Sequence, residues 1–506
     1  MLSVLRNRTY RRLFGAQVVA LAGTGLATVA LSLLAYDLAG ADAAAVLGTA
    51  LAIKMAAYVA IAPVVTALAD RVRPRTLLVS ADLARAAVAL SLPFVDRVWQ
   101  VYVLILLLQA ASAAFTPAFQ ATIPRVLPDE REYTEALSLS RLAYDLESLA
   151  SPVLAAALLT VLPYAWLFTG TAAGFLASAL LVRSTALPAP PARAVPAEAG
   201  VDAEAEAGGH GGRGGRARRV YAKAAFGTRL LLATPRLRAL LALDLAVAAA
   251  GAVVLVGTVL LVRDTLGRGA GDVPLALGAY GAGSMAVALL LPRVLGRTGD
   301  RAVMVRAAFV LPAALGLLAA GLAVPPGAWS WPALLALWSV LGAAGSAVLT
   351  PGGRVVRRSA ASGDLPAAFA ARFSLSHACW LVTYPLAGVL AVRAGPAVAA
   401  AVLGAVALLG AVGAARLWPR TDPAELPHAH PELPAGHPHL AGAGGAHAHD
   451  FRIDALHRYW PEAPGPHGSG RPAPARTGRG RSGPGPSASG QRGRRISRPS
   501  RTTSRP

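Results

Sequence analysis

Ionisable side chains inside long apolar stretches are the first residues of this chain whose types and spacing suggest chemistry. Asp82 and Arg85 lie three positions apart in one such stretch, so a helix would place them on one face. They can neutralise each other, or Asp82 can pair with Arg71. The sequence leaves two roles open for the pair, a structural ion pair and the binding of a proton or substrate.

A second group of charges lies in the apolar stretch that begins near residue 133. Arg141 and Asp145 are four positions apart and are expected to pair, whereas Glu147 points elsewhere on a helix and has no obvious partner. A carboxylate held in an apolar cavity can take up a proton, which makes Glu147 a candidate proton carrier. Alternatively, all three residues lie near one end of the stretch, in contact with water.

Two single charges lie about two helical turns inside other apolar stretches. The long side chain of Lys54 can extend to the outer surface or face an internal cavity. Asp244 is a candidate cavity residue. Charges are costly inside an apolar layer, so each is a hypothesis for a proton or substrate site.

Histidine pairs form a separate group near the end of the chain. The three pairs are His428-Ala-His430, His437-Pro-His439 and His447-Ala-His449. In a flexible segment such pairs can chelate Ni, Cu or Zn through imidazole nitrogen, although they lack the fixed spacing of a folded zinc site. The alternatives are a transient divalent-metal site and a low-complexity tail without function. No other cofactor is expected.

The elements that must position these groups are about twelve long apolar stretches. A helix needs about 20 apolar residues to cross a hydrocarbon layer of ~30 Å, and a spanning segment must satisfy its backbone groups internally. Charged residues make up only 15% of the chain and its net charge is +22, with a mean hydropathy of +0.51. These features predict an all-α protein that crosses a membrane many times.

The predicted spans fall into two sets of six. They are Leu13–Tyr36, Val46–Leu68, Thr76–Val95, Trp99–Ile123, Tyr133–Leu162 and Ala165–Val182, then Leu237–Val262, Val273–Leu295, Met304–Val324, Trp331–Leu349, Pro366–Val392 and Ala397–Trp418. This divides the chain into a first bundle (1–182), a disordered linker (183–235), a second bundle (236–418) and a disordered tail (419–506), rich first in His and then in Arg.

Basic residues collect in alternate connections between the spans. Arg73, Arg125, Arg297 and Arg357 belong to such connections, and Arg8 precedes the first span on the same side. The opposite connections are poor in Lys and Arg, apart from the mixed loop Arg263–Asp272. Because positive loops stay in the cytoplasm, both termini are predicted to be cytoplasmic and the protein to lie in the cell membrane.

The two sets of spans share a loop sequence. Leu68-Ala-Asp-Arg-Val-Arg-Pro-Arg75 follows the second span, and Arg293-Val-Leu-Gly-Arg-Thr-Gly-Asp-Arg301 follows the eighth. In this register Arg71 aligns with Arg297, and Arg75 with Arg301. Two related six-helix halves are typical of one large class of transporters.

The first of these loops resembles the signature of the major facilitator superfamily, Gly-x-x-x-Asp-Arg-x-Gly-Arg-(Arg/Lys). Asp70 and Arg71 match its Asp-Arg, and Arg75 matches a basic position. The resemblance implies two pseudo-symmetric six-helix bundles. It also implies that this loop and its counterpart at Arg297 and Arg301 act as a conformational latch, whose ion pairs differ between two arrangements of the halves.

A narrower resemblance lies in the fourth and fifth spans. Phe115-Thr-Pro-Ala-Phe-Gln-Ala-Thr-Ile-Pro124 and Ser151-Pro-Val-Leu-Ala-Ala-Ala157 are similar to stretches of bacterial exporters of the enterobactin and macrolide-efflux type. The His-rich tail resembles that of some nickel-resistance permeases of the same subgroup.

The resemblance implies an efflux antiporter that exports a drug-like or siderophore-like small molecule in exchange for protons. Its expected partners are the substrate, protons and lipid, without nucleic acid, and the protein is expected to be a monomer. Divalent-metal efflux and a non-transporting membrane sensor or scaffold are the alternatives. An enzyme is not expected, because the sequence contains no nucleophile–base set or phosphate-binding loop.

Overall fold

The structure is a computed structural model. It describes residues 2–39, 43–68, 72–188, 225–269, 271–422, 425–430, 433, 438–440, 446–453, 456–457 and 460–461. Three residues singled out above, Asp70, Arg71 and His437, lie outside these ranges.

Twelve helices of the described residues are long and apolar enough to cross a membrane. Those of the first half are α1 (Arg8–Ala39), α2 (Ala43–Leu68), α3 (Pro74–Ser91), α4 (Val98–Val126), α5 (Glu130–Leu159) and α6 (Ala165–Arg183). Those of the second half are α9 (Pro235–Leu260), α10 (Asp272–Leu295), α11 (Asp300–Leu322), α12 (Ser330–Leu349), α14 (Leu365–Ala394) and α15 (Pro396–Leu417). The predicted all-α fold of twelve spans is confirmed.

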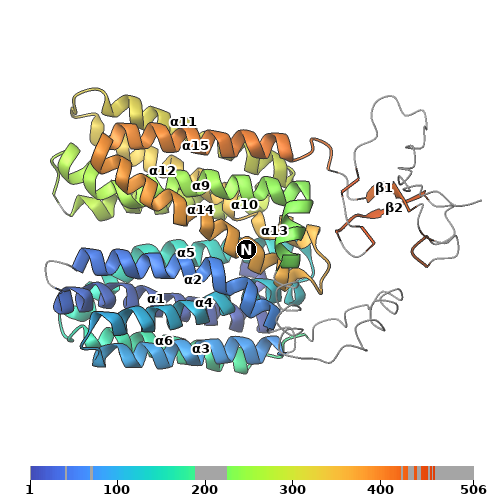
Figure 1. Ribbon diagram of the computed structural model, residues 1–506, viewed down its shortest axis with the longest axis horizontal. Coiled ribbons are helices and arrows are strands. Elements are labelled where there is room, and N and C mark those ends of the chain that lie inside the picture. Colours follow the sequence, from blue (N-terminus) through green and yellow to red (C-terminus); the bar gives the residue numbers. More distant parts are fainter. Residues whose placement is uncertain are drawn as a thin grey trace, which may run out of the picture. The chain divides into compact units, whose positions relative to one another are not determined.

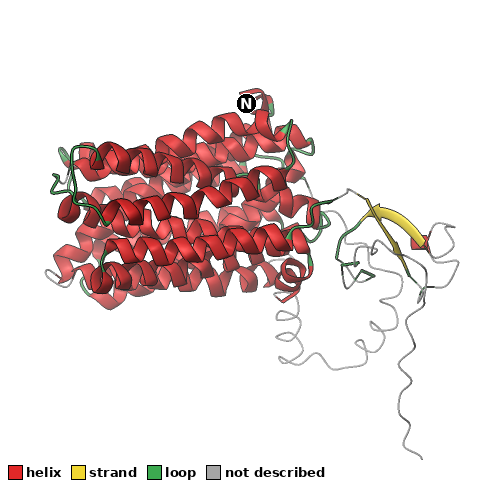
Figure 2. Cartoon of the chain, turned by 90° about the horizontal axis from the view of Figure 1, so that it is seen from above, coloured by secondary structure: helices red, strands yellow, loops and turns green. Residues whose placement is uncertain are grey.

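The shorter elements connect or flank these helices. They are the 3₁₀ helices η1 (Leu2–Arg6), η4 (Leu92–Phe94) and η6 (Pro438–Leu440), the π-helical turn η5 (Leu261–Thr265), the helix α13 (Gly352–Ser359), and the strands β1 (Glu425–Ala429) and β2 (Ala446–Asp450). In Figure 2 these two strands are yellow, and nearly all the other regular elements of the described residues are helices, in red.

The helix ends follow from local sequence. The carboxylate of Asp129 accepts a hydrogen bond of 2.9 Å from the backbone N–H of Glu132 and so caps α5. Gly395 has φ of +89° and separates α14 from α15 by one residue. Glycine adopts this left-handed conformation without steric cost, which allows the chain to reverse direction there.

Equivalent helices pack in equivalent ways within the two halves. In the first half α6 packs on α1 and α3, and α4 packs on α2 and α3; in the second half α15 packs on α9 and α11, and α12 packs on α10 and α11. The halves meet chiefly through two pairs that exchange under the same symmetry, α2 with α14 and α10 with α5, and to a lesser extent through α4 with α14 and α13 with α5. Figure 1 shows α2 and α5 beside α14 and α10.

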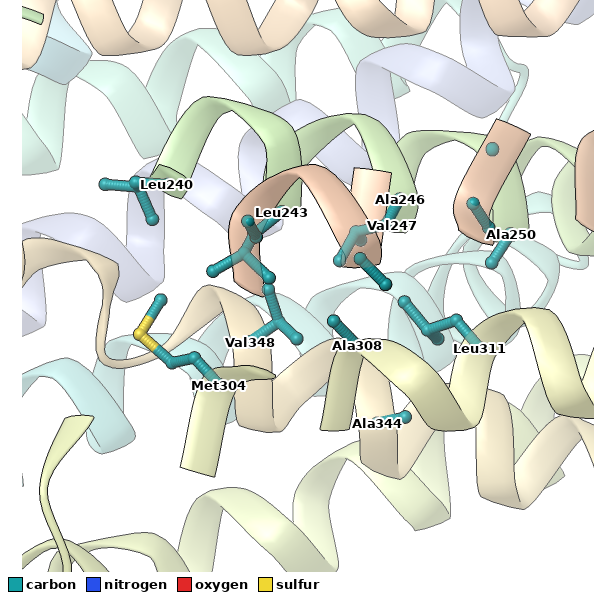
Figure 3. Packing of buried hydrophobic residues seen from close by; sticks show 14 of the residues in the cluster. Leu240, Leu243, Ala246, Val247, Ala250, Met304, Ala308, Leu311, Ala344 and Val348 are labelled. Carbon is teal, nitrogen blue, oxygen red and sulfur yellow. The ribbon is translucent and has the colours of Figure 1, made fainter. Parts of the chain in front are cut away.

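Small side chains let the helices of the second half approach closely. The main apolar cluster joins Leu243, Ala246 and Val247 of α9 to Ala308 of α11 and Ala344 of α12, all buried (Figure 3). Other apolar side chains point outward, as at Val153 and Leu409, which are 70% and 71% exposed. Outward apolar side chains suit contact with lipid rather than water.

Two ordered segments occur in stretches that the sequence predicts as disordered. Residues 225–233 are helical, and Leu230 and Leu231 join the apolar cluster of the second half. In the tail, β1 and β2 pair as an antiparallel ladder. The helix at 225–233 falls within Val220–Ala233, a stretch whose sequence also suits a short amphipathic helix, whereas the ladder joins residues distant in the chain and composition does not indicate it.

We expect Gly283→Ala to destabilise the second half by about 1–3 kcal/mol, the usual cost of overpacking. A Cβ at Gly283 of α10 would lie 1.9 Å from the carbonyl oxygen of Ser339 in α12, and backbone cannot move aside as a flexible side chain can. The measurement is the thermal unfolding midpoint in detergent. Gly278→Ala is the matched control, since a Cβ at Gly278 of the same helix meets nothing within 4 Å. Equal midpoints for the two variants would contradict this packing.

Candidate functional site

A hydrogen-bonded triad joins the two halves midway along their helices. Arg141 of α5 binds Asp145 one turn later, with 2.9 Å between Nη2 and Oδ1. Ser284 of α10 donates to Asp145 Oδ2 at 2.6 Å, and Arg141 donates to the Ser284 hydroxyl oxygen from Nη2 at 2.9 Å. Asp145 and Ser284 are buried. The predicted pair of Arg141 and Asp145 is therefore present, and it has a partner in the other half.

A second polar group lies at the junction of α2 and α14. Lys54 Nζ lies 5.9 Å from the centre of the Tyr58 ring. The Tyr58 ring contacts those of Phe373 and His377 on α14, with centroids 4.9 and 4.8 Å apart. Lys54 therefore lies on the side of α2 that faces the other half.

Glu147 lies on α5 with Lys54 as its opposing charge and a hydrogen bond to Ser151. Gly25 of α1 provides the space for this arrangement, because a Cβ there would lie 1.8 Å from Ser151 Oγ and 2.8 Å from Glu147 Oε1. The predicted candidates Lys54 and Glu147 thus act on each other electrostatically. The sequence offered no sign of this, since they are on different helices.

Asp82 and Arg85 form an ion pair within the first half. Asp82 is 0% and Arg85 5% exposed. Ser178 of α6 donates to Asp82 Oδ2 at 2.7 Å, and the guanidinium carbon of Arg85 lies 4.2 and 4.5 Å from the ring centres of Phe115 and Phe175. Enclosure by α4 and α6 favours the structural alternative for this pair over substrate binding.

Asp244 of α9 pairs with Arg372 of α14, a residue that the sequence interpretation missed. Arg372 Nη2 lies 3.4 Å from Asp244 Oδ1. The only sequence signal for this partner was a basic residue inside the eleventh predicted span. Because both helices belong to the second half, this pair also stabilises one half internally.

A further polar cluster joins the halves at the end of the bundle that carries the connections α4–α5 and α13–α14. Arg354 of α13 contacts Asp300 of its own half, with 3.0 Å between Nε and Oδ1, and Glu130 of α5, with 2.5 Å between Nη2 and Oε1. Arg125 at the end of α4 donates to the Ser362 carbonyl at 3.1 Å, and Arg357 donates to the Pro128 carbonyl. We call this cluster the basic gate.

A family model describing the major facilitator superfamily matches residues 13–323, more than half of the chain. The chain belongs to this superfamily. Similarity to individual members is low: the uncharacterised MFS-type transporter YfiS of Bacillus subtilis (strain 168) is 27% identical over 124 residues, which cover 24% of this chain and 30% of that protein. These similarities establish the superfamily but not what the whole chain transports.

Solved structures of the superfamily share the fold. The human organic anion transporter MFSD10 aligns with a TM-score of 0.61 and 15% identity over 80% of this chain and 99% of that one. The fucose:proton symporter FucP of Escherichia coli aligns in its outward conformation with a TM-score of 0.59 and 13% identity, over 81% and 98% of the two chains.

The superfamily loop signature is only partly within the described residues, since Asp70 and Arg71 lie outside them. Arg75 donates to the carbonyl of Arg183 at the end of α6. Its counterpart Arg301 donates to the carbonyls of Ala415 and Trp418 at the end of α15, at 3.2 and 3.1 Å. Arg75 and Arg301 thus make equivalent contacts, each inside its own half, whereas Arg297 is exposed. Contacts between halves at this end of the bundle come from the basic gate.

The tail histidines converge beyond the region that the family model matches. Five of the six predicted ligands, together with His457, form two overlapping groups whose ligand atoms lie within 4.8 Å of one another; these are His428, His430, His439 and His457, and His428, His439, His447 and His449. His457 was not among the predicted ligands because it stands alone in the sequence. Burial and neighbouring imidazoles lower the pKa of His439 to about 4, so its ring is neutral at pH 7.

We expect Asp82→Asn to destabilise the protein by about 3–5 kcal/mol, because it leaves the Arg85 guanidinium buried without its counter-charge. Asp82→Asn combined with Arg85→Met removes both charges and should recover most of the loss. Thermal unfolding in detergent measures both effects. If the double variant were as unstable as the single one, the pair would not be the reason for the instability.

Proposed function

We propose that this protein is a proton-coupled exporter of a small organic molecule that works by alternating access. In this proposal it is a monomer in the cell membrane, with both termini in the cytoplasm. Membership of the superfamily supports transport across a membrane. The observation that carries the proposal is the placement of two carboxylates, Asp145 and Glu147, beside bases where the halves meet.

Alternating access needs contacts that break when the halves rock apart. The triad of Arg141, Asp145 and Ser284 is such a contact, because Ser284 belongs to the other half. Protonation of Asp145 would remove the charge that holds Arg141, and protonation of Glu147 would release Lys54. Proton uptake from the outer side would therefore break this contact between the halves and let the empty carrier turn inward with its proton, which is the return step of an antiporter.

Aromatic side chains near these charges indicate the class of substrate. Tyr58, Phe373, Trp380 and Tyr384 are partly exposed on α2 and α14, and the rings of Trp380 and Tyr384 contact each other with centroids 4.9 Å apart. Aromatic faces together with Lys54 and Arg141 suit an aromatic, amphipathic or anionic molecule. This supports a drug-like or siderophore-like substrate. It also agrees in charge with the organic anions named for MFSD10.

The arrangement of the halves supports a conformation closed to the cytoplasm. Hydrogen bonds between the halves run from the basic gate to the middle of the helices. One is the bond of Ser284 to Asp145, and another joins α14 to α2, where Ser374 donates to the Val59 carbonyl. If the basic connections are cytoplasmic, the basic gate closes that side. Metal efflux and a sensor or scaffold remain alternative hypotheses; a scaffold has no need of charges inside its spans.

We expect Glu147→Gln to lower proton-driven export by roughly tenfold or more, equivalent to ~1.4 kcal/mol in the coupled step, because glutamine cannot take up the proton. The measurement is substrate uptake into inverted vesicles, with and without a proton gradient, for a panel of organic dyes and for Ni²⁺. Glu132→Gln is the control, since Glu132 is an exposed carboxylate on the same helix. Equal uptake with and without the proton gradient would exclude antiport. Gradient-driven uptake of Ni²⁺ but of none of the dyes would favour metal efflux.

We expect Arg354→Gln to shift the protein toward a conformation open at the basic gate, because it removes the contact with Glu130 across the halves. The distance between spin labels at Glu132→Cys and Gly363→Cys, in a Cys379→Ser background, should lengthen. Both labelled positions are exposed and lie in different halves. Arg393→Gln, an exposed arginine at the far end of α14, is the control. An unchanged distance in Arg354→Gln would show that the gate does not hold the halves together.

A further inference from the structure

Six imidazoles converge in the tail, outside the spans and outside the proposed transport route. We propose that residues 425–457 hold one divalent transition-metal ion through the Nε2 atoms of His428, His430, His439, His447, His449 and His457. The argument rests on the positions of these rings and is independent of the proposed transport function.

The strand pairing places four of the ligands together. In the ladder of β1 and β2, His428 lies directly opposite His447. His430 and His449 each lie two residues further along the chain from one of these. Side chains two apart in a strand point to the same face of a sheet, so the two His-x-His pairs share one face. His439 in η6 and His457 after β2 complete the set.

The nitrogen atoms have the spacing of a metal site. Nε2 of His457 lies 3.0 Å from that of His428 and 3.2 Å from that of His430. Nε2 of His439 lies 3.2 Å from that of His430, 3.0 Å from that of His447 and 3.4 Å from that of His449. Metal–imidazole bonds of about 2.0–2.1 Å place neighbouring ligand atoms roughly 2.8–3.4 Å apart, the shorter distances at octahedral and the longer at tetrahedral angles. All six Nε2 atoms are linked by contacts in this range.

The rings are arranged like the corners of an octahedron. His428 and His439 are the two apices, with centroids 6.2 Å apart. The other four rings lie between them in a closed circuit, in which His430, His447, His449 and His457 follow one another at 5.5, 5.1, 5.1 and 4.9 Å. Each apex lies within 5.0 Å of all four rings of this circuit.

The tautomer of His428 supports metal binding. Its Nδ1 lies 2.9 Å from the carbonyl oxygen of Leu426. A carbonyl only accepts hydrogen bonds, so Nδ1 carries the proton and Nε2 presents a lone pair to the other rings. A backbone carbonyl on the second nitrogen is the usual way to orient a metal-binding histidine.

The ligand set defines the class of metal. Mg²⁺ and Ca²⁺ prefer oxygen ligands, whereas imidazole suits first-row transition metals such as Ni²⁺, Co²⁺, Cu²⁺ and Zn²⁺. Six ligands exceed the four of a structural zinc site. The geometry therefore favours a cation that accepts six nitrogens, and Ni²⁺ and Co²⁺ are the appropriate probes.

The site is continuous with the second half through aromatic contacts. The Phe451 ring lies 4.7 Å from that of His457 and 5.1 Å from that of Trp460. The guanidinium carbon of Arg236, at the start of α9, lies 5.2 Å from the Trp460 ring centre. Because metal binding and folding are coupled in small sites, bound metal should stabilise the contacts of Phe451 and Trp460 that connect the histidines with α9.

The test is Ni²⁺ binding by the full-length protein in detergent, purified through a tag that contains no histidine. Titration calorimetry and elemental analysis should give one Ni²⁺ per chain. His428→Gln combined with His439→Gln, which removes both apices, should weaken binding by about 100-fold or more. His467→Gln, a histidine elsewhere in the tail, is the control and should bind as the unaltered protein does.

Co²⁺ spectra and proteolysis complete the test without any measure of transport. Bound Co²⁺ should show the weak visible bands of six-coordination, and metal should protect residues 425–460 from protease in the unaltered protein only. Several weak sites per chain, or equal loss of binding in His467→Gln, would overturn the proposal. So would unchanged binding in the double variant. An intense four-coordinate Co²⁺ spectrum would overturn the six-ligand assignment.

Discussion

The absence of water from a hydrocarbon layer is the constraint on which this structure depends. Every polar group inside the spans must find its partner in the protein, and where that partner lies decides what the group can do. Asp82 with Arg85, and Asp244 with Arg372, find theirs within one half. Arg141 and Asp145 share Ser284 with the opposite half. In the proposed alternating access, rocking of the halves would leave the first kind intact and break the second.

Because the two halves are pseudo-symmetric, equivalent polar contacts occur inside each of them. The contacts of Arg75 with the end of α6, and of Arg301 with the end of α15, stabilise two rigid bodies in the same way. Rigid halves matter because a change at one contact is then transmitted along whole helices. The basic gate and the triad of Arg141, Asp145 and Ser284 bind the same two bodies at different depths. Breaking the contacts of the gate or those of the triad would therefore weaken the association of the two halves, which both sets of contacts maintain.

Sequence alone predicted whatever depends on local spacing. The twelve spans follow from length and hydropathy, and the pairs of Asp82 with Arg85 and Arg141 with Asp145 follow from separations of three and four residues. The contact with Ser284, the pairing of Asp244 with Arg372, and the facing of Lys54 and Tyr58 toward α14 were not predictable. They depend on how each helix is rotated about its axis, and uniformly apolar helices rich in Ala, Leu and Val give little sign of rotation.

The tail illustrates the same limit. His-x-His spacing identified most of the ligands, but the ladder that brings His428 opposite His447 is a long-range pairing that composition did not indicate. His457 joins them although no neighbouring residue in the sequence marks it. A motif search finds ligands that are adjacent in sequence, whereas a metal site selects those that are adjacent in space.

Arg236 connects the tail with the basic gate. Its guanidinium donates to the Ser359 hydroxyl at 2.7 Å and to the Arg358 carbonyl at 3.0 Å, and it lies 3.3 Å from Asp422. Ser359 and Arg358 end α13, the helix that carries Arg354 and Arg357 into the gate. The Trp460 ring lies over the same guanidinium. A ligand held by the tail histidines would therefore act on the end of α13, and through α13 on the contacts that join the halves.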